Sequence, residues 1–367
     1  MHNKLFSNRF AAILLKWNKN LNKRSMPWKG EKNPYKIWLS EIILQQTRVE
    51  QGLKYYENFV NNYPTINDLA NASDAEVFKL WEGLGYYSRC RNLIATAKHI
   101  SLKYQGQFPT TYEEILRLKG VGPYTAAAIA SFAFNLPHAV VDGNVFRVLA
   151  RIFGVETPID NTEGKKYFMQ LANRLMDKNN AGEYNQAIMD FGATICKPVA
   201  PLCHICVFQK YCTAFHSERI NMLPLKGKKI LQRTRYFYFF IISYKNKIVV
   251  KERVEKDIWR GLHQFPLVET NDSQNTQTVV ETGIKKGWLH SKNDVMTVSK
   301  IFSQKLTHQT IKSVFITIRA AKKPTVRDNY FWVDSQLLQT LAFPKMLSDY
   351  MNKNNFDIIF YHQLKKI

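Results

Sequence analysis

The chain has 367 residues, of which 45% are hydrophobic, and it carries a formal net charge of +23 at pH 7. Its length predicts two domains of common size. It has no apolar run of about 18 residues and no signal-peptide core, which predicts a cytoplasmic protein that does not bind membranes. Residues 1–225 contain 27 basic and 18 acidic side chains, and residues 226–367 contain 25 and 11. This excess of basic side chains favours nucleic acid over an acidic small molecule as the partner. A lysine-rich surface that serves only solubility would show the same excess.

Residues 1–215 show apolar side chains at the spacing of α-helices. Apolar residues from Phe6 to Trp17 recur on one helix face, and Asn33-Pro34 starts a second helix that runs through Leu44. Further helices are expected near 49–62, 74–80, 85–104, 111–117, 144–153, 161–177 and 183–194. The first domain is therefore predicted to be mainly α.

Residues 216–234 lack a sustained period and contain Pro224 and Gly227, which predicts a linker. Residues 235–367 show a different pattern. Strands are expected at 235–244, 247–253, 295–302 and 311–318, and helices near 276–288 and 335–352. The second domain is therefore predicted to be α+β.

The stretch from Leu118 to Arg147 begins with a tight turn. Gly120-Val121-Gly122 allows the turn with bare backbone, and Pro123 has the fixed φ of a first helical residue. Several backbone N–H groups should then point outward at a helix N-terminus, which predicts a phosphate-binding hairpin over residues 118–125. An ordinary helix–helix turn has the same pattern, and GVG alone does not separate the two.

The same stretch presents a carboxylate near its end. Asp142 follows an apolar run and precedes a helical pattern that begins with Gly143-Asn144. Residue type alone favours an N-cap role, because Asp is a preferred N-cap residue. The alternative is a carboxylate presented at a catalytic site.

Four of the five cysteines form the pattern C-x6-C-x2-C-x5-C within 17 residues: Cys196, Cys203, Cys206 and Cys212. Reducing conditions in a cytoplasm disfavour disulfides, so this loop, residues 196–212, predicts a metal site. Four thiolates suit either a structural zinc ion or an iron–sulfur cluster. Thiolate ligation alone does not decide between them.

The GVG hairpin, Asp142 and the four-cysteine loop together resemble the helix-hairpin-helix DNA glycosylases of the endonuclease III superfamily, and within it the adenine DNA glycosylases of the MutY type. The matching stretches are MPWKGEKNPYKIWLSEIILQQTRV, LWEGLGYYSRCRNL, LKGVGPYTAAAIA, VVDGNVFRVLAR, NQAIMDFGATIC and IWRGLHQFP. These stretches are spread over most of residues 1–215 and part of the remaining chain, and they occur in the same order as in the family. The resemblance implies one [4Fe-4S] cluster held by the four cysteines and a C-terminal Nudix-like domain.

Hydrolysis of the bond between adenine and deoxyribose needs an acid that makes the base a neutral leaving group and a negative charge that stabilises the oxocarbenium-like sugar. Glu41 lies in an otherwise apolar helix beside Leu39 and Ile42, where desolvation should raise its pKa and keep a proton available. A solvated helix face is the alternative. The resemblance assigns proton donation and water activation to Glu41 and stabilisation of the cationic sugar to Asp142, with Asn144 as a polar partner in the same pocket.

Tyr124 follows the GVG hairpin by two residues. Members of the superfamily that also cut the DNA strand carry a lysine there, which can form a Schiff base, whereas a phenol cannot. The resemblance therefore implies monofunctional base removal, with Tyr124 hydrogen-bonded to Glu41 or to the sugar. Trp28 and Asp190 fall on family positions that line the adenine pocket.

A base inside a duplex must be flipped out before it can react. The segments Gln45-Gln46-Thr47 and Gly85-Tyr86-Tyr87 match the family segments that enter the duplex. The resemblance implies that Gln46 contacts the orphaned partner base and that Tyr86 is the wedge. Ordinary core packing is the alternative for the tyrosine pair.

The second domain resembles the Nudix-like module with which such enzymes read 8-oxoguanine opposite the adenine. The segment after Pro266 lacks the Glu-rich helix of Nudix hydrolases, so pyrophosphate hydrolysis is not expected. The family's Phe-Ser-His recognition tip corresponds to Leu306-Thr307-His308. Thr307 keeps the hydroxyl and His308 is retained, while the aromatic ring is lost.

The sequence thus predicts a monomeric base-excision-repair enzyme of the cytoplasm, associated with the nucleoid, that binds double-stranded DNA and removes adenine paired with 8-oxoguanine or G. Two alternatives stay open. One is a bifunctional glycosylase and lyase for oxidised pyrimidines, which Tyr124 in place of lysine and the second domain both oppose. The other is a non-enzymatic DNA-binding protein with a structural four-cysteine metal site.

Overall fold

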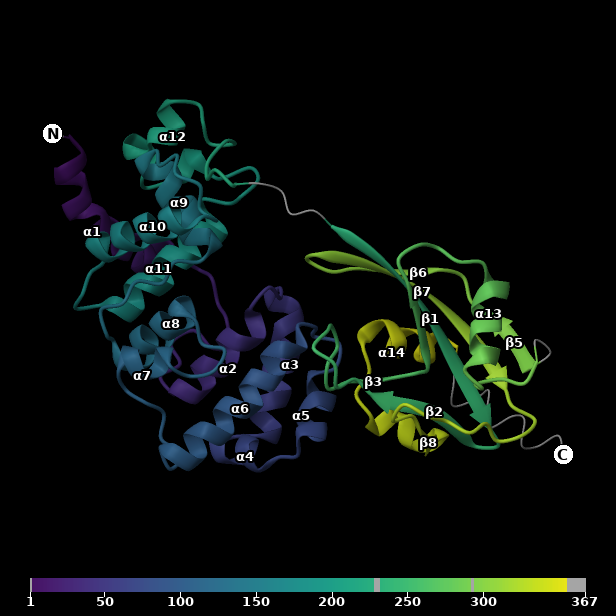
Figure 1. Ribbon diagram of the computed structural model, residues 1–367. Helices are drawn as coiled ribbons and strands as arrows, with labels where there is room; N and C mark the ends of the chain where they lie inside the picture. The colour runs from purple at the N-terminus through teal and green to yellow at the C-terminus, as the bar shows by residue number, and fades with distance from the viewer. Residues whose placement is uncertain (1, 228–231, 292–293, 355–367) are drawn as a thin grey trace. The chain divides into compact units, whose positions relative to one another are not determined.

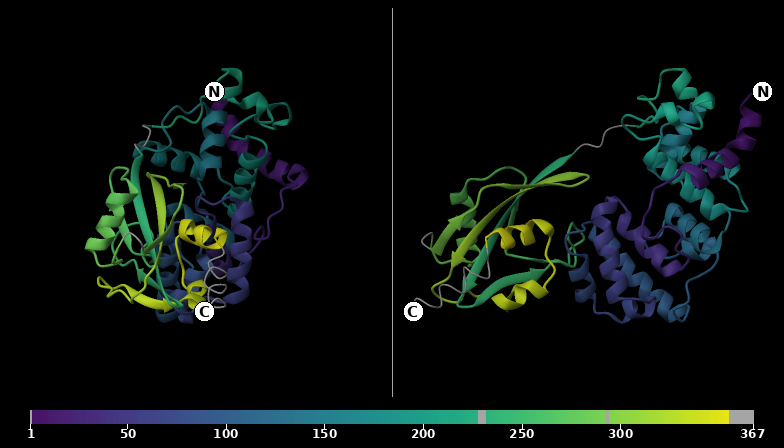
Figure 2. Two further views of the ribbon diagram at one scale, coloured as in Figure 1. Left: turned by 90° about the vertical axis from the view of Figure 1, so that its right-hand side faces the viewer. Right: turned by 180° about the vertical axis from the view of Figure 1, so that it is seen from behind.

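The computed structural model describes residues 2–227, 232–291 and 294–354. Contacts divide the chain into two compact units, a first unit of residues 1–71 and 92–228 and a second unit of residues 72–91 and 229–367. Figure 1 labels the elements along the chain, and Figure 2 shows them in two further views. Within the described ranges, no helix is both long and apolar enough to cross a bilayer.

The first unit is built from helices, which confirms the predicted mainly α domain. They are α1 (His2–Leu21), α2 (Pro34–Leu44), α3 (Val49–Asn62), α4 (Ile66–Asn71), most of α6 (Tyr87–Lys103), α7 (Tyr112–Leu116), α8 (Pro123–Phe134), α9 (Gly143–Phe153), α10 (Thr162–Leu175), α11 (Ala181–Thr194) and α12 (Thr213–His216). The short 3-10 turns η1 (Cys203–Ile205) and η2 (Gln209–Tyr211) lie between α11 and α12. The helix α5 (Asp74–Trp81) and the first residues of α6 belong to the second unit.

An aromatic core fixes α1 against α11. Phe10 of α1 stacks on Phe208 with ring centroids 4.8 Å apart, and Phe191 of α11 lies edge-on to the same Phe208 ring at 5.2 Å. Trp17 of α1 also lies edge-on to Phe191, at 4.9 Å. These side chains are all buried, so their apolar area and ring geometry stabilise one position of α11.

Two glycines let α11 approach its neighbours closely. A Cβ at Gly182 would lie 2.7 Å from the carbonyl oxygen of Ser131 on α8, and a Cβ at Gly192 would lie 2.7 Å from the Cβ of Asn144 on α9. Such distances are too short for a real side chain in a close-packed interior, so only glycine permits this packing. As a result, α8 and α9 both pack on α11.

The second unit contains an eight-stranded mixed sheet, and the predicted α+β class is confirmed. Its elements are β1 (Arg233–Tyr244), β2 (Lys247–Glu252), β3 (His263–Gln264), β4 (Leu267–Thr270), α13 (Thr276–Lys285), β5 (Val295–Val298), β6 (Phe302–Lys305), β7 (Gln309–Arg319), β8 (Phe331–Asp334), η4 (Ser335–Thr340) and α14 (Lys345–Lys353). The strand order is β3-β2-β1-β7-β5, with β4 also paired to β1, β6 to β7 and β8 to β2. The strands β1 and β7 run parallel, from Arg233 opposite Gln309 to Ser243 opposite Arg319.

The strand β1 is buried on both faces, which explains its nearly continuous apolar sequence. Tyr238 and Phe240 belong to the core that includes residues of α13. On the opposite face, Phe239 stacks on Phe315 at 5.5 Å, and Phe315 stacks on Tyr350 of α14 at 3.9 Å. A helix therefore covers each face of the sheet (Figures 1 and 2).

The predicted strand at 295–302 is wrong in extent, because this segment forms the end of one strand and the start of another. Val298 pairs with Ile316, and Phe302 pairs with Ser313. The segment therefore contains one residue more than β7 over the same interval. The extra residue cannot pair, so the chain bulges between β5 and β6.

The predicted helix at 335–352 is also wrong in extent. It is divided into η4 and α14, and the chain is extended at Leu341 and at Pro344. A residue that precedes proline is disfavoured in helical conformation. Pro344 therefore prevents one continuous helix from running through η4 and α14. The strands β3, β4 and β8 and the helix α4 were not predicted, because each has six residues or fewer and shows no sustained period.

The segment that the sequence assigns to a linker, 216–234, begins with residues that pack on the first unit. Leu223 is buried, and its carbonyl oxygen accepts a hydrogen bond from Arg151 Nε at 3.1 Å. Further along, the Gly227 N–H donates to the Asp160 carboxylate at 2.7 Å. The segment through Gly227 is part of the first unit, and β1 of the second unit begins at Arg233.

Candidate active site

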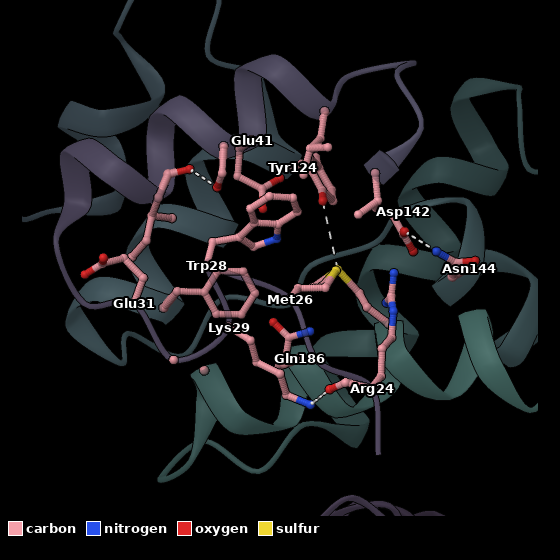
Figure 3. A pocket seen from close by; sticks show the side chains of 18 of the residues that line it. Arg24, Met26, Trp28, Lys29, Glu31, Glu41, Tyr124, Asp142, Asn144 and Gln186 are labelled. Carbon is pink, nitrogen blue, oxygen red and sulfur yellow. Dashed lines mark hydrogen bonds between the residues drawn. The ribbon is translucent and has the colours of Figure 1, made fainter. Parts of the chain in front are cut away.

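A cavity of about 640 Å³ lies in the first unit, where α2, α8, α9 and α11 approach one another. Most of the residues predicted for the catalytic pocket line it: Trp28, Glu41, Gln45, Gln46, Thr47, Tyr124, Asp142 and Asn144. Figure 3 shows Glu41, Tyr124 and Asp142 along one side of this space, with Trp28, Gln186 and Arg24 facing them. The fold thus brings together side chains that lie about a hundred positions apart in sequence.

Glu41 lies on α2 among buried apolar residues. The residue is partly accessible through the cavity, but its carboxyl group is removed from bulk water. Burial raises the pKa of Glu41 to about 7, a hydrogen bond with Tyr124 opposes the rise, and the charge of Asp142 adds to it. A carboxylic acid with this pKa still holds a proton near neutral pH, which a general acid requires.

Tyr124 lies in the first turn of α8, which begins after the GVG hairpin. Burial raises the pKa of its phenol well above the usual value, and the nearby charges of Glu41 and Asp142 raise it further. The phenol therefore stays protonated and acts as a hydrogen-bond donor. Its hydroxyl contacts Glu41 and also lies 3.9 Å from the sulfur of Met189 on α11.

Asp142 is the N-cap of α9, as residue type favours, and it also faces the cavity. One carboxylate oxygen accepts the Val145 N–H at 2.8 Å, and the other accepts Asn144 Nδ2 at 2.8 Å (Figure 3). Burial raises the pKa of Asp142, while these hydrogen bonds and the charge of Arg147 oppose the rise. The cap orients the carboxylate beside the cavity, which is compatible with the predicted catalytic role.

A chain of hydrogen bonds leads from Asp142 to the cysteine loop. Asn144 donates to Asp142, and the Asn144 side-chain oxygen accepts from Arg147 Nη2 at 2.8 Å. Arg147 Nε then donates to the Cys196 carbonyl oxygen at 2.8 Å, and Nη2 also donates to the Gly192 carbonyl oxygen at 2.8 Å. Arg147 therefore connects the first turn of α9 to the end of α11 and to the first cysteine of the loop.

Asp190 lies behind the cavity wall and is not one of the residues that line it. Its fully buried carboxylate accepts hydrogen bonds from Arg24 and Lys29 at 2.8 Å, from Asn22 at 2.8 Å and from Gln186 at 2.9 Å. A buried carboxylate needs such partners, because desolvation without them is costly. Arg24, Lys29 and Gln186 do line the cavity, so Asp190 fixes that wall from behind.

The residues after α2 expose one side chain beside the cavity. Gln46 is exposed and has a φ of 56°, a left-handed conformation that is uncommon outside glycine and frequent at functional sites. Its neighbours are held in place: Gln45 Nε2 donates to Thr125 Oγ1 at 3.3 Å, and the Thr47 N–H donates to the Leu44 carbonyl oxygen at 3.1 Å.

Trp28 forms another part of the cavity wall, in the segment between α1 and α2. Its ring packs edge-on against Tyr56 of α3 with centroids 5.4 Å apart. This contact holds the indole beside the cavity, where a planar base could pack against it.

The predicted hairpin precedes α8. Gly120 has a φ of 78°, and a Cβ there would lie 2.6 Å from the Cβ of Asn92. Gly122 is the N-cap of α8, Pro123 is its first residue, and Val121 is buried between the two exposed glycines. The glycines therefore permit both the turn and the close approach to α6, and they leave bare backbone at a helix N-terminus.

The four cysteines of the loop line one small space beside α9 and the end of α11: Cys196, Cys203, Cys206 and Cys212. None of them forms a disulfide. In the part of the chain that the structure describes, no group of three His, Cys, Asp or Glu side chains is arranged to hold a single metal ion.

Arg151 fixes the same loop. Its guanidinium is buried and donates to the Lys197 carbonyl oxygen at 2.7 Å and to the Pro198 carbonyl oxygen at 3.2 Å. It also lies 3.6 Å from Cys196 Sγ. Arg151 therefore fixes the backbone of the loop beside its first cysteine.

In the second unit, the structure brings the predicted wedge to the predicted recognition tip. Tyr86 is 45% exposed with a φ of 49°, and Thr307 and His308 form the turn between β6 and β7. The hydroxyl groups of Tyr86 and Thr307 form a hydrogen bond with each other. Both residues and His308 line a second cavity, of about 630 Å³.

Known proteins share this architecture. Residues 39–175 match the model of the HhH-GPD superfamily base excision DNA repair protein, and residues 237–353 match that of the NUDIX domain. The chain is similar to the adenine DNA glycosylase of Buchnera aphidicola subsp. Baizongia pistaciae (strain Bp), with 33% identity over 349 residues that cover 94% of this chain and 96% of the relative. The chain belongs to the adenine DNA glycosylase family.

The other similarities agree with this family and confirm the predicted resemblance and fold class. The adenine DNA glycosylase of Homo sapiens is 41% identical over 227 residues, which cover 59% of this chain and 41% of that protein. Among solved structures, a thermostable thymine-DNA glycosylase has a TM-score of 0.55 and 30% identity and covers 59% of this chain and 100% of its own. An endonuclease III–DNA complex, with a TM-score of 0.50, 21% identity and coverage of 58% and 97%, shows the same fold. The protein is thus a DNA glycosylase of base excision repair.

Several residues of the site were not predicted from sequence. Arg24, Lys29 and Gln186 line the cavity, and Arg147 connects it to the cysteine loop. Arg147 follows Asn144 by three positions, a helical spacing that could have indicated their contact. The first two lie in an irregular segment between α1 and α2, where no periodicity indicates direction.

Proposed function

We propose that this member of the adenine DNA glycosylase family flips adenine out of a DNA duplex and hydrolyses its bond to deoxyribose where the opposite base is 8-oxoguanine or G. The observation that carries the proposal is the pair of carboxyl groups in one cavity. Glu41 has a pKa raised to about 7 by burial, and Asp142 is held by hydrogen bonds that favour its charged form. Two carboxyl groups in different environments can divide the acidic and the anionic roles.

The reaction follows from these two environments. Glu41 donates its proton to an adenine nitrogen as the bond between base and sugar breaks, so adenine leaves as a neutral molecule. Asp142 stabilises the positive charge that develops on the sugar. Glu41, now a carboxylate, accepts a proton from the attacking water, whose oxygen forms the new bond to the sugar. Tyr124 donates a hydrogen bond to Glu41, and Asn144 keeps Asp142 oriented.

The reaction is monofunctional in this proposal. A lyase needs an amine that forms a Schiff base with the sugar, and Tyr124 supplies a protonated phenol at the cavity instead. The product is then an intact strand with an abasic site. Strand breakage therefore requires later treatment with alkali.

Residues of both units contact the DNA in this proposal. The backbone of the hairpin at Gly120, Val121 and Gly122 binds a phosphate, and the net charge of +23 favours the duplex. Exposed Gln46 contacts the base that loses its partner, and exposed Tyr86 enters the stack. Thr307 and His308 read 8-oxoguanine from the second unit. The protein acts as a monomer on chromosomal DNA in the cytoplasm.

The four cysteines of the loop hold one [4Fe-4S] cluster in this proposal. The space that they surround and the buried guanidinium of Arg151 beside Cys196 fit such a group. When it is bound, the cluster supplies a covalent cross-link for the loop and a redox-active centre. Purified protein should be brown, with broad absorption near ~400 nm and with bound iron, whereas a zinc protein would be colourless.

Incubation with defined duplexes tests the reaction. The substrates are duplexes with A opposite 8-oxoguanine, A opposite G and thymine glycol opposite A, each analysed with and without alkali. We expect free adenine from the first two, strand breaks only after alkali, and no product from the third. Borohydride should trap little covalent adduct through position 124. Breaks without alkali on thymine glycol would favour a bifunctional enzyme, and binding without any product would favour a DNA-binding protein.

A further inference from the structure

The second unit contains an arginine that the proposed reaction does not use. Arg235 of β1 is buried, with 8% of its surface exposed. It forms a bidentate ion pair with Glu269 of β4, with distances of 2.7 and 2.8 Å, and a second one with Asp257, with distances of 2.9 and 2.6 Å. The fork of a guanidinium fits two carboxylates at once, which an ammonium group cannot do.

Asp257 lies in a loop that is closed on itself, residues 253–262, which we name the clamped loop. Arg253 donates to Asp257 at 2.9 Å and, through Nε, to the Ile258 carbonyl oxygen at 3.0 Å. The Gly261 N–H donates to the Arg253 carbonyl oxygen at 2.7 Å. Two arginines therefore hold one carboxylate, and through it they fix the backbone of the clamped loop.

The clamped loop forms one wall of the second cavity, through Asp257, Ile258 and Trp259. The segment 304–309, which contains the turn with Thr307 and His308, forms another wall of the cavity. Arg235 reaches this wall as well, because its Nη1 lies 3.4 Å from Gln309 Oε1. Arg235 itself does not line the cavity, so it contacts both walls from outside.

The electrostatics show that this network stays charged. Burial alone would lower the pKa of Arg235, but its hydrogen bonds to Asp257 and Glu269 dominate and raise it above the usual value. Burial opposes the charged form of Asp257 too, yet the bonds from Arg235 leave the Asp257 pKa lowered. A buried ion network of this kind is weak evidence for stability, since a well-packed apolar set often serves as well. A role in fixing geometry accounts for it better.

We propose that Arg235 is a positioning residue for recognition of the base opposite adenine: it sets the distance between the clamped loop and the turn at Thr307 and His308. The inference rests on the proposed function, in which that turn reads the lesion. Loss of Arg235 should release Asp257 and Gln309 together. The cavity then loses its fixed width, although every side chain that lines it is still present.

The first test measures preference between duplexes. Competition binding of A:8-oxoguanine against A:G at fixed salt should show that Arg235→Gln lowers the preference ratio by about tenfold, as expected when a specific contact is misplaced. Arg235→Lys should lower it nearly as much, because charge without the fork does not bridge two carboxylates. Adenine release from bound A:G duplex in a single turnover should stay within about threefold, because the catalytic cavity lies in the first unit.

Arg233→Gln is the matched control. Arg233 lies on the same strand, carries the same charge, is exposed, and has Asn271 as its side-chain partner at 2.9 Å. Its substitution should leave the preference ratio unchanged. A folded Arg235→Gln protein that keeps the parental ratio, or an equal loss in Arg233→Gln, would overturn the inference. Absence of adenine release from every duplex by the parent protein would overturn the proposed reaction instead.

A second test measures hydrogen exchange and requires neither enzyme activity nor a DNA lesion. Hydrogen exchange in the DNA-free protein should become faster in both 253–262 and 304–309 when Arg235 is replaced by Gln, and unchanged in Arg233→Gln. Asp257→Asn, which removes only one partly exposed carboxylate, should have the same effect on the clamped loop and lower the preference ratio in the same direction. Faster exchange over the whole second unit, with no additional effect in these two segments, would indicate a general structural role and would contradict the inference.

Discussion

The two cavities of this protein shift the pKa of a carboxyl group in opposite directions. In the first, burial dominates at Glu41 and raises its pKa to about 7, so a proton is kept where chemistry needs it. In the second, two arginines hold Asp257, and its pKa is lowered. The first carboxyl group can exchange a proton near neutral pH, whereas the second remains an anion that fixes a loop. Burial without an ion-pair partner favours the protonated form of a carboxyl group, whereas arginine partners favour its charged form.

Asp190 shows that the same rule holds within the first cavity. It is more deeply buried than Glu41, but Arg24 and Lys29 neutralise it, and its role is to fix the wall. At Asp142, burial raises the pKa while hydrogen bonds from Val145 and Asn144 oppose the rise. The carboxyl groups of Glu41, Asp142 and Asp190 therefore differ in the partners that surround them.

The largest effect on the rate of adenine release is expected at Glu41, the proposed proton donor. Replacing Glu41 by Gln should slow adenine release in a single turnover by about 10² to 10⁴-fold, the usual range for loss of a general acid. Duplex affinity should survive, because no phosphate contact changes. Glu31→Gln is the control, since Glu31 lines the same cavity but is bonded to the backbone N–H groups of Lys32 and Asn33 and ion-paired with Lys36 at 3.8 Å. Activity of Glu41→Gln within about tenfold of the parent would remove Glu41 from its role.

The second prediction concerns the hydrogen bonds that hold Asp142. Arg147→Gln should slow adenine release by about tenfold to a hundredfold, because Asn144 loses a charge-assisted hydrogen bond and Asp142 loses a nearby cation. The measurement is the single-turnover rate together with iron per protein. Arg174→Gln, at an exposed position on α10, should change neither. An unchanged rate in Arg147→Gln would show that the chain from Asp142 to Cys196 has no functional effect.

The third prediction concerns the second cavity. His308→Ala should weaken the preference for A:8-oxoguanine over A:G by ~1 to 3 kcal/mol if one specific base contact is lost. Removal of adenine that is already engaged should slow much less, because the catalytic carboxyl groups lie in the other unit. Competition binding at fixed salt measures the ratio. A ratio equal to that of the parent would assign recognition to Gln46, Tyr86 and the helical unit.

The smallest effect is a pH dependence of stability. The pKa of Glu41 is raised from 4.5 to about 7, so the folded protein binds more protons than the unfolded chain between these pH values. Stability therefore falls as pH rises through this window, and above it the buried carboxylate destabilises the fold. Glu41→Gln, which cannot ionise, should unfold at a higher temperature than the parent at pH 8 and show a smaller gain at pH 5. Calorimetry at both pH values measures this difference, and a gain independent of pH would contradict the assigned shift.

Much of the site could be predicted from sequence because its residues lie in motifs with local physical causes. The turn at Gly120 and the cap at Asp142 are set by neighbouring residues, and the spacing of the four cysteines is visible in the chain. The apolar neighbours of Glu41 already indicate that its pKa is raised. The extra residue between β5 and β6 could not be predicted in the same way, because it is defined only relative to β7.

The sequence by itself therefore determined the fold class of both regions and the spacing of the four cysteines, since each depends on residue type and near-neighbour spacing. The catalytic roles of Glu41 and Asp142 stay predictions. Only the tertiary structure decided that Asp190 lies behind the wall and that Arg147 reaches Cys196. It also decided that Arg235 holds Asp257 and Glu269 together, across 22 and 34 positions of the chain. Periodicity and propensity describe how a segment relates to its own neighbours, whereas the partner of a buried charge is set by which segments fold against each other.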